Sequence, residues 1–203
     1  IETARQERDP WEHATVLSGD LAGDDEYPDE ESAPSMEENS YTVIVAEDTG
    51  VNNVLDGVIV TGGNTQGVEA PWEEGGGIRH LGGSLTVQNC ILAANRAGTK
   101  GGGMFSGEGA TTTAVNCVFE TNYADTSGGA ASCWSGSAAS FVGCLFRDNV
   151  GKHYCGGLDV VSGSAVTLIN CTLDGNVSLS DNADLAHLGT GSTALFVNSV
   201  LSV

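Results

Sequence analysis

The stretch LTVQNCILAAN, residues 85–95, is followed at a fixed distance by three variants of itself: TTAVNCVFETN at 112–122, ASFVGCLFRDN at 139–149 and VTLINCTLDGN at 166–176. The cysteine near the middle of each copy recurs every 27 residues. A fixed period of this size, built from β-forming and turn residues, is typical of a solenoid whose coils stack on one another.

Alignment on the cysteine produces two columns of identical residues and a third column of apolar ones. Stacked cysteines next to apolar neighbours act as small hydrophobes, and stacked asparagines can hydrogen-bond along a ladder and tolerate the left-handed backbone of a bend. The predicted ladder consists of Cys90, Cys117, Cys144 and Cys171 together with Asn95, Asn122, Asn149 and Asn176. A Gly-Gly phrase opens each coil and predicts an apolar column of Ile78, Met104, Ala130, Leu158 and Leu185.

The repeat favours parallel strands over hairpins and helices. Short alternating segments are divided by Gly or Asn every 8–12 residues, and no stretch has the 3.6-residue period of a long amphipathic helix. Hairpins would not repeat one phrase in one direction, whereas coils of parallel strands place equivalent residues about 4.8 Å apart. We therefore expect an all-β, right-handed parallel β-helix with roughly 27 residues per coil and six to seven coils.

The whole chain, 1–203, is expected to form one β-helix domain. Residues 54–203 form the regular coils, starting with VLDGVIVTGGN at 54–64, which matches the repeated phrase. Residues 1–53 are predicted to form distorted N-terminal coils interrupted by an acidic loop at 20–39.

Charge excludes several classes of partner. Seven Lys and Arg residues against 27 Asp and Glu residues give a net charge of −20, with 13 of the acids in residues 1–40. Nucleic acid would be repelled, because its binding needs clustered cations that neutralise phosphate. No apolar run approaches the roughly 20 residues that a membrane-spanning helix needs.

The acidic loop offers a candidate calcium site at Asp20, Asp24 and Asp25, because Ca²⁺ prefers oxygen ligands. Ala22 stands at the central ligand position of such a loop, and Glu31 is the nearest match in this run to the glutamate of the twelfth position. A solvated acidic loop without a metal is the alternative, and the chain is otherwise expected to carry no cofactor.

The cysteines leave two alternatives to buried thiols open, a disulfide between neighbouring coils or a metal site. Metal sites usually place cysteines in closely spaced pairs, whereas each cysteine of the column is a full coil from the next. Cys133 and Cys155 lie outside the column, 22 residues apart, and could bridge adjacent coils.

No catalytic constellation is evident. A glycosidase needs two carboxylates facing each other across a groove, and no paired-Asp signature of the pectinase-like hydrolases is present. We therefore expect no enzymatic activity. Trp72, beside Pro71, is the candidate for an exposed contact with a ligand.

The run ETARQERDPWEHATVLSGDLAGDD (2–25), followed by LDGVIVTGGN (55–64) and the repeated GGG(I/M) and NC phrases, resembles secreted bacterial right-handed parallel β-helix repeat proteins of the polymorphic outer-membrane and surface-protein type. The resemblance implies the fold and an extracellular or cell-surface location. It implies no particular activity, because one fold serves many functions.

The termini suggest a function of their own. The sequence ends on ALFVNSVLSV (194–203), a strand phrase without a polar cap, although solenoids normally cover their ends. We expect a non-catalytic extracellular structural or adhesive protein that associates with copies of itself head to tail, with polysaccharide or a cell surface as a further contact. The alternatives are a polysaccharide lyase or glycoside hydrolase, or a carbohydrate-binding fragment of a large surface adhesin.

Overall fold

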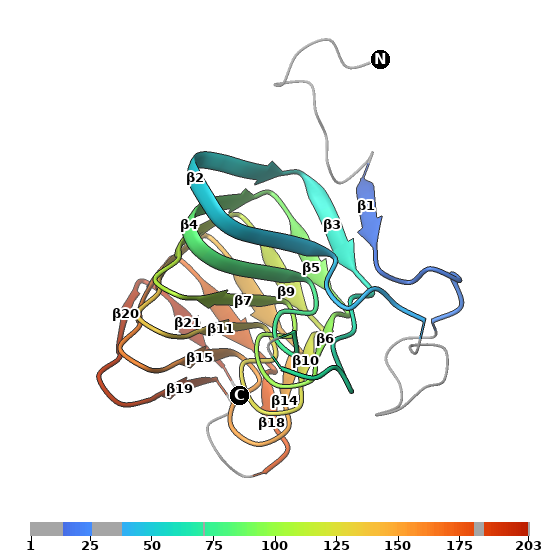
Figure 1. The fold of residues 1–203 in the computed structure, drawn as a ribbon. Helices are drawn as coiled ribbons and strands as arrows, with labels where there is room; N and C mark the ends of the chain where they lie inside the picture. The colour runs from blue at the N-terminus through green and yellow to red at the C-terminus, as the bar shows by residue number, and fades with distance from the viewer. Residues whose placement is uncertain (1–13, 26–37, 71, 181–184, 203) are drawn as a thin grey trace.

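The computed structural model describes residues 14–25, 38–70, 72–180 and 185–202, and every regular element among them is a β-strand. Neighbouring strands pair parallel throughout, so that the chain winds into a solenoid (Figure 1). Tyr123 pairs with Val150, which lies 27 residues further on. The all-β parallel solenoid is therefore confirmed, whereas its right-handed sense and its six to seven coils stay predictions.

Three parallel sheets run along the solenoid, each collecting strands from successive coils. The seven-stranded sheet contains β1 (Thr15–Ser18), β3 (Val58–Thr61), β5 (Ile91–Ala93), β9 (Val118–Glu120), β13 (Leu145–Arg147), β17 (Thr172–Asp174) and β21 (Val200–Leu201). The four-stranded sheet contains β6 (Arg96–Ala97), β10 (Tyr123–Ala124), β14 (Val150–Gly151) and β18 (Val177–Ser178). The ten-stranded sheet contains β2 (Ile44–Asp56), β4 (Ile78–Gln88), β7 (Met104–Gly107), β8 (Thr111–Val115), β11 (Ala131–Cys133), β12 (Ala138–Val142), β15 (Leu158–Val160), β16 (Ala165–Ile169), β19 (Ala186–Leu188) and β20 (Thr193–Val197).

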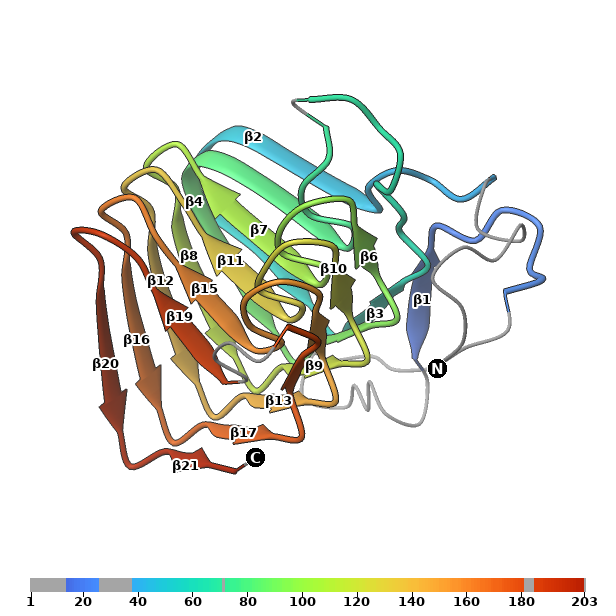
Figure 2. The same cartoon turned by 90° about the horizontal axis from the view of Figure 1, so that it is seen from below.

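The ten-stranded sheet divides into two faces beyond β4. The first part of β4 pairs with β7 and its second part with β8, so one long strand is continued by two short ones (Figure 2). The turns that separate these short strands carry two residues with positive φ, such as Glu108 (52°) and Gly109 (73°). Glycine at the second place adopts this backbone without steric cost.

The N-terminal segments lie in earlier coils. β1 pairs with β3 through Thr15 and Val58, and β2 pairs with β4 through Ile44 and Ile78. The register of β2 against β4 shifts between Thr49 and Asn53, which distorts this coil.

The predicted apolar column needs a correction at two positions. Ile78 and Met104 continue in register to Ala131 and not to Ala130, then to Leu158, and from there to Ala186 and not to Leu185. The first glycine of the phrase is Gly75, Gly101 or Gly128, because these three share a positive φ. Counted from Gly128, Ala130 stands at the position of the third glycine in the other coils. In the last coil one extra residue, between Ser178 and Ala186, shifts the register.

The interior of the solenoid is packed with aliphatic, cysteine and phenylalanine side chains. The rings of Phe119 and Phe146 stack at 4.8 Å on neighbouring coils, and Phe141 meets both edge-on. Such parallel stacking follows directly from coils that repeat in register.

Candidate functional site

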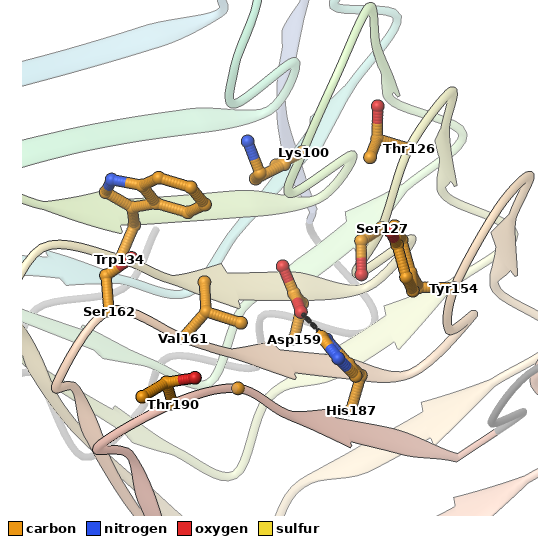
Figure 3. Close-up of a pocket in the computed structure, with 11 residues that line it drawn as sticks. Lys100, Thr126, Ser127, Trp134, Tyr154, Asp159, Val161, Ser162, His187 and Thr190 are labelled. Carbon is orange, nitrogen blue, oxygen red and sulfur yellow. Dashed lines mark hydrogen bonds and ion pairs between the residues drawn. The ribbon is translucent and has the colours of Figure 1, made fainter.

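A pocket with a volume of about 360 Å³ opens beside β11, β15 and β19 (Figure 3). Asp159 of β15 and His187 of β19 line it, and the other lining residues come from the loops before and after β11, β15 and β19 and, for Lys100, from the loop before β7. The side chains that give it chemical character are Lys100, Ser127, Trp134, Tyr154, Asp159 and His187.

The strand pleat explains why a carboxylate reaches this pocket. Leu158 and Val160 belong to the hydrophobic core, so Asp159 between them points to the opposite, outer face of β15. Ser132 of β11 and His187 of β19 occupy the same register position on the neighbouring coils. Three polar side chains therefore form a row on the outer face.

Asp159 is only 2% exposed, yet both carboxylate oxygens are hydrogen-bonded. Its Oδ1 atom lies 2.7 Å from Nδ1 of His187, and the hydroxyl of Ser132 donates to Oδ2 at 3.2 Å. These two bonds satisfy a buried acid that would otherwise be costly. The bond to Asp159 also fixes the orientation of the His187 ring, whose Nε2 atom has no hydrogen-bond partner among the described residues.

Two aromatic side chains flank this pair. Tyr154 stacks on the ring of His187 with centroids 5.0 Å apart, and Lys100 places its Nζ atom 4.0 Å from the centroid of Trp134. Tyr154 is 43% exposed and Trp134 is 37% exposed. The pocket thus combines exposed aromatic surface with fixed polar groups, which is how ligand sites obtain both contact area and orientation.

Sequence reasoning missed the Asp159–His187 pair because of the one-residue displacement described above. With Ala130 and Leu185 in the apolar column, Ala131 and Ala186 would have been the neighbours of Asp159 across the coils. The corrected register instead gives the outer column Arg79, Phe105, Ser132, Asp159 and His187. The signal that could have revealed it is a polar residue between two apolar ones in three successive coils, namely Ser132, Asp159 and His187.

The structure brings Asp20, Asp24 and Asp25 together, with one carboxylate oxygen of each within 4.8 Å of the others. Asp20 accepts a hydrogen bond from the backbone N–H of Gly23, and Asp25 accepts one from the side chain of Asn39. Residues 26–37 of the predicted acidic loop lie outside the described residues, so calcium binding there stays a prediction.

Trp72 lies outside the pocket. It is 47% exposed, and the guanidinium of Arg79 lies 4.7 Å from the centroid of its ring. Arg79 is also paired with Glu47. The expected role of Trp72 as a ligand contact therefore has no support from the pocket and stays a prediction.

The asparagine column lies inside the solenoid. Each side-chain amide nitrogen donates to the side-chain oxygen of the asparagine one coil further on. The distances are 3.1 Å from Asn95 to Asn122, 3.0 Å from Asn122 to Asn149 and 2.8 Å from Asn149 to Asn176, the last member of the row. The same nitrogens bond backbone carbonyls, for example Leu92 from Asn122. This ladder satisfies buried polar groups and offers no surface to a ligand.

The cysteines are also internal. Cys90, Cys117, Cys144 and Cys171 are buried free thiols, and the last three donate to backbone carbonyls of the preceding coil at 3.3–3.5 Å. Cys133 and Cys155 are also buried free thiols, so no disulfide joins them. Burial raises the pKa of both thiols to about 12, which keeps them protonated.

Comparisons with family models, curated proteins and solved structures gave no match to this chain. The parallel solenoid expected from the resemblance is thus present, whereas membership of the secreted bacterial repeat proteins stays a prediction. Among the described residues, no helix has the length and apolar character required to cross a membrane.

Proposed function

We propose that this solenoid is a carbohydrate-binding scaffold whose ligand occupies the pocket beside β11, β15 and β19. The observation that carries the proposal is the placement of two exposed aromatic side chains, Trp134 and Tyr154, next to the buried and hydrogen-bonded Asp159–His187 pair. Aromatic faces provide apolar contact area for a sugar ring, and fixed polar groups can hydrogen-bond its hydroxyls.

Binding is favoured over hydrolysis because of the number of carboxylates. Glycoside hydrolysis commonly uses two carboxyl groups, about 5–10 Å apart. Among the described residues that line the pocket, Asp159 is the only one with a carboxylate, and its oxygens already bond Ser132 and His187. A binding role without turnover therefore fits the described groups better than a glycosidase.

Calorimetric titration with a panel of oligosaccharides tests this proposal. Trp134→Ala and Tyr154→Ala should each weaken binding by about tenfold or more, since loss of an aromatic anchor in an interface typically costs over 1 kcal/mol. Tyr41→Ala is the matched control, because Tyr41 is 60% exposed and does not line the pocket. Equal affinities for all four proteins would contradict the proposal.

An extracellular or cell-surface location belongs to the same proposal, since polysaccharide is abundant there. Fractionation of the native source, followed by detection of the chain in each fraction, would test the location independently of binding.

Head-to-tail association is a second candidate, supported by one specific observation. Phe196 of β20 and Leu201 of β21 continue core columns from Leu168 and Leu173, yet they are 36% and 48% exposed. A second copy that adds a coil at this end would cover them. Sedimentation analysis of the wild type and of Phe196→Asp tests this candidate, which predicts assemblies of the wild type and monomers of the variant.

A further inference from the structure

Lys100 differs from three other basic side chains of the solenoid in its partners. Arg79 pairs with Glu47, Arg147 pairs with Glu120, and His187 pairs with Asp159. Lys100 has no carboxylate within ion-pair distance among the described residues, and its contact is the face of Trp134. A ring face attracts the ammonium but leaves its three N–H donors able to bind oxygen atoms.

This arrangement is unexpected in a chain with 27 acidic and seven basic residues. No described acid near the pocket lies within ion-pair distance of Lys100. Asp159 is occupied by Ser132 and His187. Glu74 interacts with Lys100 only electrostatically and without an ion-pair contact; burial raises the pKa of its carboxyl, and the charges of Lys100 and Arg79 lower it.

Hydroxyl donors accompany Lys100 on the next coil. Lys100 and Ser127 are register partners in an isolated parallel bridge. Thr126 and Ser127 both line the pocket (Figure 3), and the buried Ser127 hydroxyl also lies 3.4 Å from Sγ of Cys155. An ammonium with adjacent hydroxyls is suited to an oxyanion, because charge-assisted hydrogen bonds are stronger than neutral ones. The aromatic ring beneath Lys100 holds the cation at the pocket wall.

We infer that the saccharide bound in this pocket carries an anionic group, a carboxylate or a sulfate, and that this group binds Nζ of Lys100. The inference rests on the proposed carbohydrate-binding function and adds the chemical class of the ligand. Non-specific attraction cannot supply such binding, because the net charge of −20 repels polyanions.

Two pairs of polymers test the inference, since the members of each pair differ in charge. Polygalacturonate is compared with its fully methyl-esterified form, and dextran sulfate is compared with dextran. We expect the wild-type protein to bind at least one charged member about tenfold more tightly than its uncharged partner, and the pair that shows the difference identifies carboxylate or sulfate.

Lys100→Gln should abolish the difference within the pair, and Lys100→Arg should restore most of it. Lys152→Gln is the control, because it removes the same charge from a lysine that does not line the pocket. Thermal unfolding of each variant checks whether the fold is retained. Equal losses from Lys100→Gln and Lys152→Gln would overturn the inference.

The two proposals fail in different ways. Binding of uncharged dextran or methyl-esterified polymer with undiminished affinity, lost in Trp134→Ala, would retain carbohydrate binding and overturn the anionic ligand. Absence of binding to all four polymers would overturn the anionic ligand, and absence of binding across the oligosaccharide panel would overturn carbohydrate binding itself.

Discussion

His187 and Asp159 are register partners on β19 and β15, and their side chains meet with Nδ1 and Oδ1 2.7 Å apart on the outer face of the solenoid. The contact joins two coils across 28 residues of sequence. Because Ser132 bonds the other oxygen of Asp159, one carboxylate connects three successive coils. The pair is therefore both a wall of the pocket and a clamp on the coil that contains β19.

Loss of this clamp should loosen β19 before it unfolds the whole chain. Asp159→Asn retains the size of the side chain but removes its charge, and we expect a loss of about 1–3 kcal/mol in the free energy of unfolding. Hydrogen exchange at residues 186–188 should accelerate more than at β8. Glu108→Gln, an equivalent change at an exposed turn, should leave both measurements unchanged.

The asparagine ladder predicts a larger effect. Asn122→Ala removes a donor to Asn149 and to the carbonyl of Leu92, and an acceptor for the amide of Asn95, all of them buried. Each unsatisfied buried group costs about 1–3 kcal/mol, so the free energy of unfolding measured with urea should fall by at least that amount.

Gln88→Ala provides the comparison for the ladder, because the Gln88 side chain makes no hydrogen bond among the described residues. A similar destabilisation in both variants would show that the ladder contributes nothing specific.

Acid should destabilise the solenoid through His80. This side chain is fully buried, with Nδ1 2.8 Å from the hydroxyl of Thr112 and Nε2 3.3 Å from that of Thr49. Burial lowers the pKa of His80, so between the folded pKa and the unfolded value of about 6.5 the unfolded chain binds more protons. The free energy of unfolding is therefore expected to fall as the pH is lowered below about 6.5, by up to roughly 1.4 kcal/mol per pH unit.

Urea unfolding of the wild type and of His80→Gln between about pH 7.5 and about pH 5.5 measures this contribution. The variant should be less stable at neutral pH and should depend less steeply on pH over this range. An identical pH dependence of both proteins would contradict the assignment to His80.

The six buried thiols give a direct test of the free-cysteine structure. An alkylating reagent should modify the native protein slowly, because the thiols are buried and the pKa values of Cys133 and Cys155 are raised to about 12. After unfolding without a reductant, mass spectrometry should find all six cysteines alkylated. Four modified cysteines would instead indicate a disulfide.

The sequence predicted the interior of this fold better than its surface. A column such as Asn95 to Asn176 is enforced by stacking, since one missing member leaves buried partners unsatisfied, and a constant 27-residue spacing therefore persists. Loops carry no such constraint. The single residue added between Ser178 and Ala186 costs the solenoid little, but it moves His187 out of the expected period and hides its pairing with Asp159.

The column that precedes the cysteines leads to a last prediction. Asn89, Asn116, Asn170 and Asn198 have φ between 47° and 54°, and Gly143, which interrupts the row, has φ of 63°. Both residue types tolerate this left-handed backbone, but glycine loses more conformational entropy on folding. Gly143→Asn should therefore change the free energy of unfolding by less than about 1 kcal/mol, because the entropy that glycine loses on folding is offset against the strain of a Cβ atom at positive φ.

A Cβ atom at Gly143 would approach Oδ1 of Asn116 to 2.9 Å, and that flexible side chain has to move slightly to accept it. Gly143→Val is the matched comparison, because it meets the same neighbour but carries a β-branched side chain that disfavours positive φ. Valine should destabilise the protein clearly more than asparagine does, as measured by thermal unfolding. If both substitutions destabilised the protein equally, the contact with Asn116 rather than the backbone conformation would govern this corner of the coil.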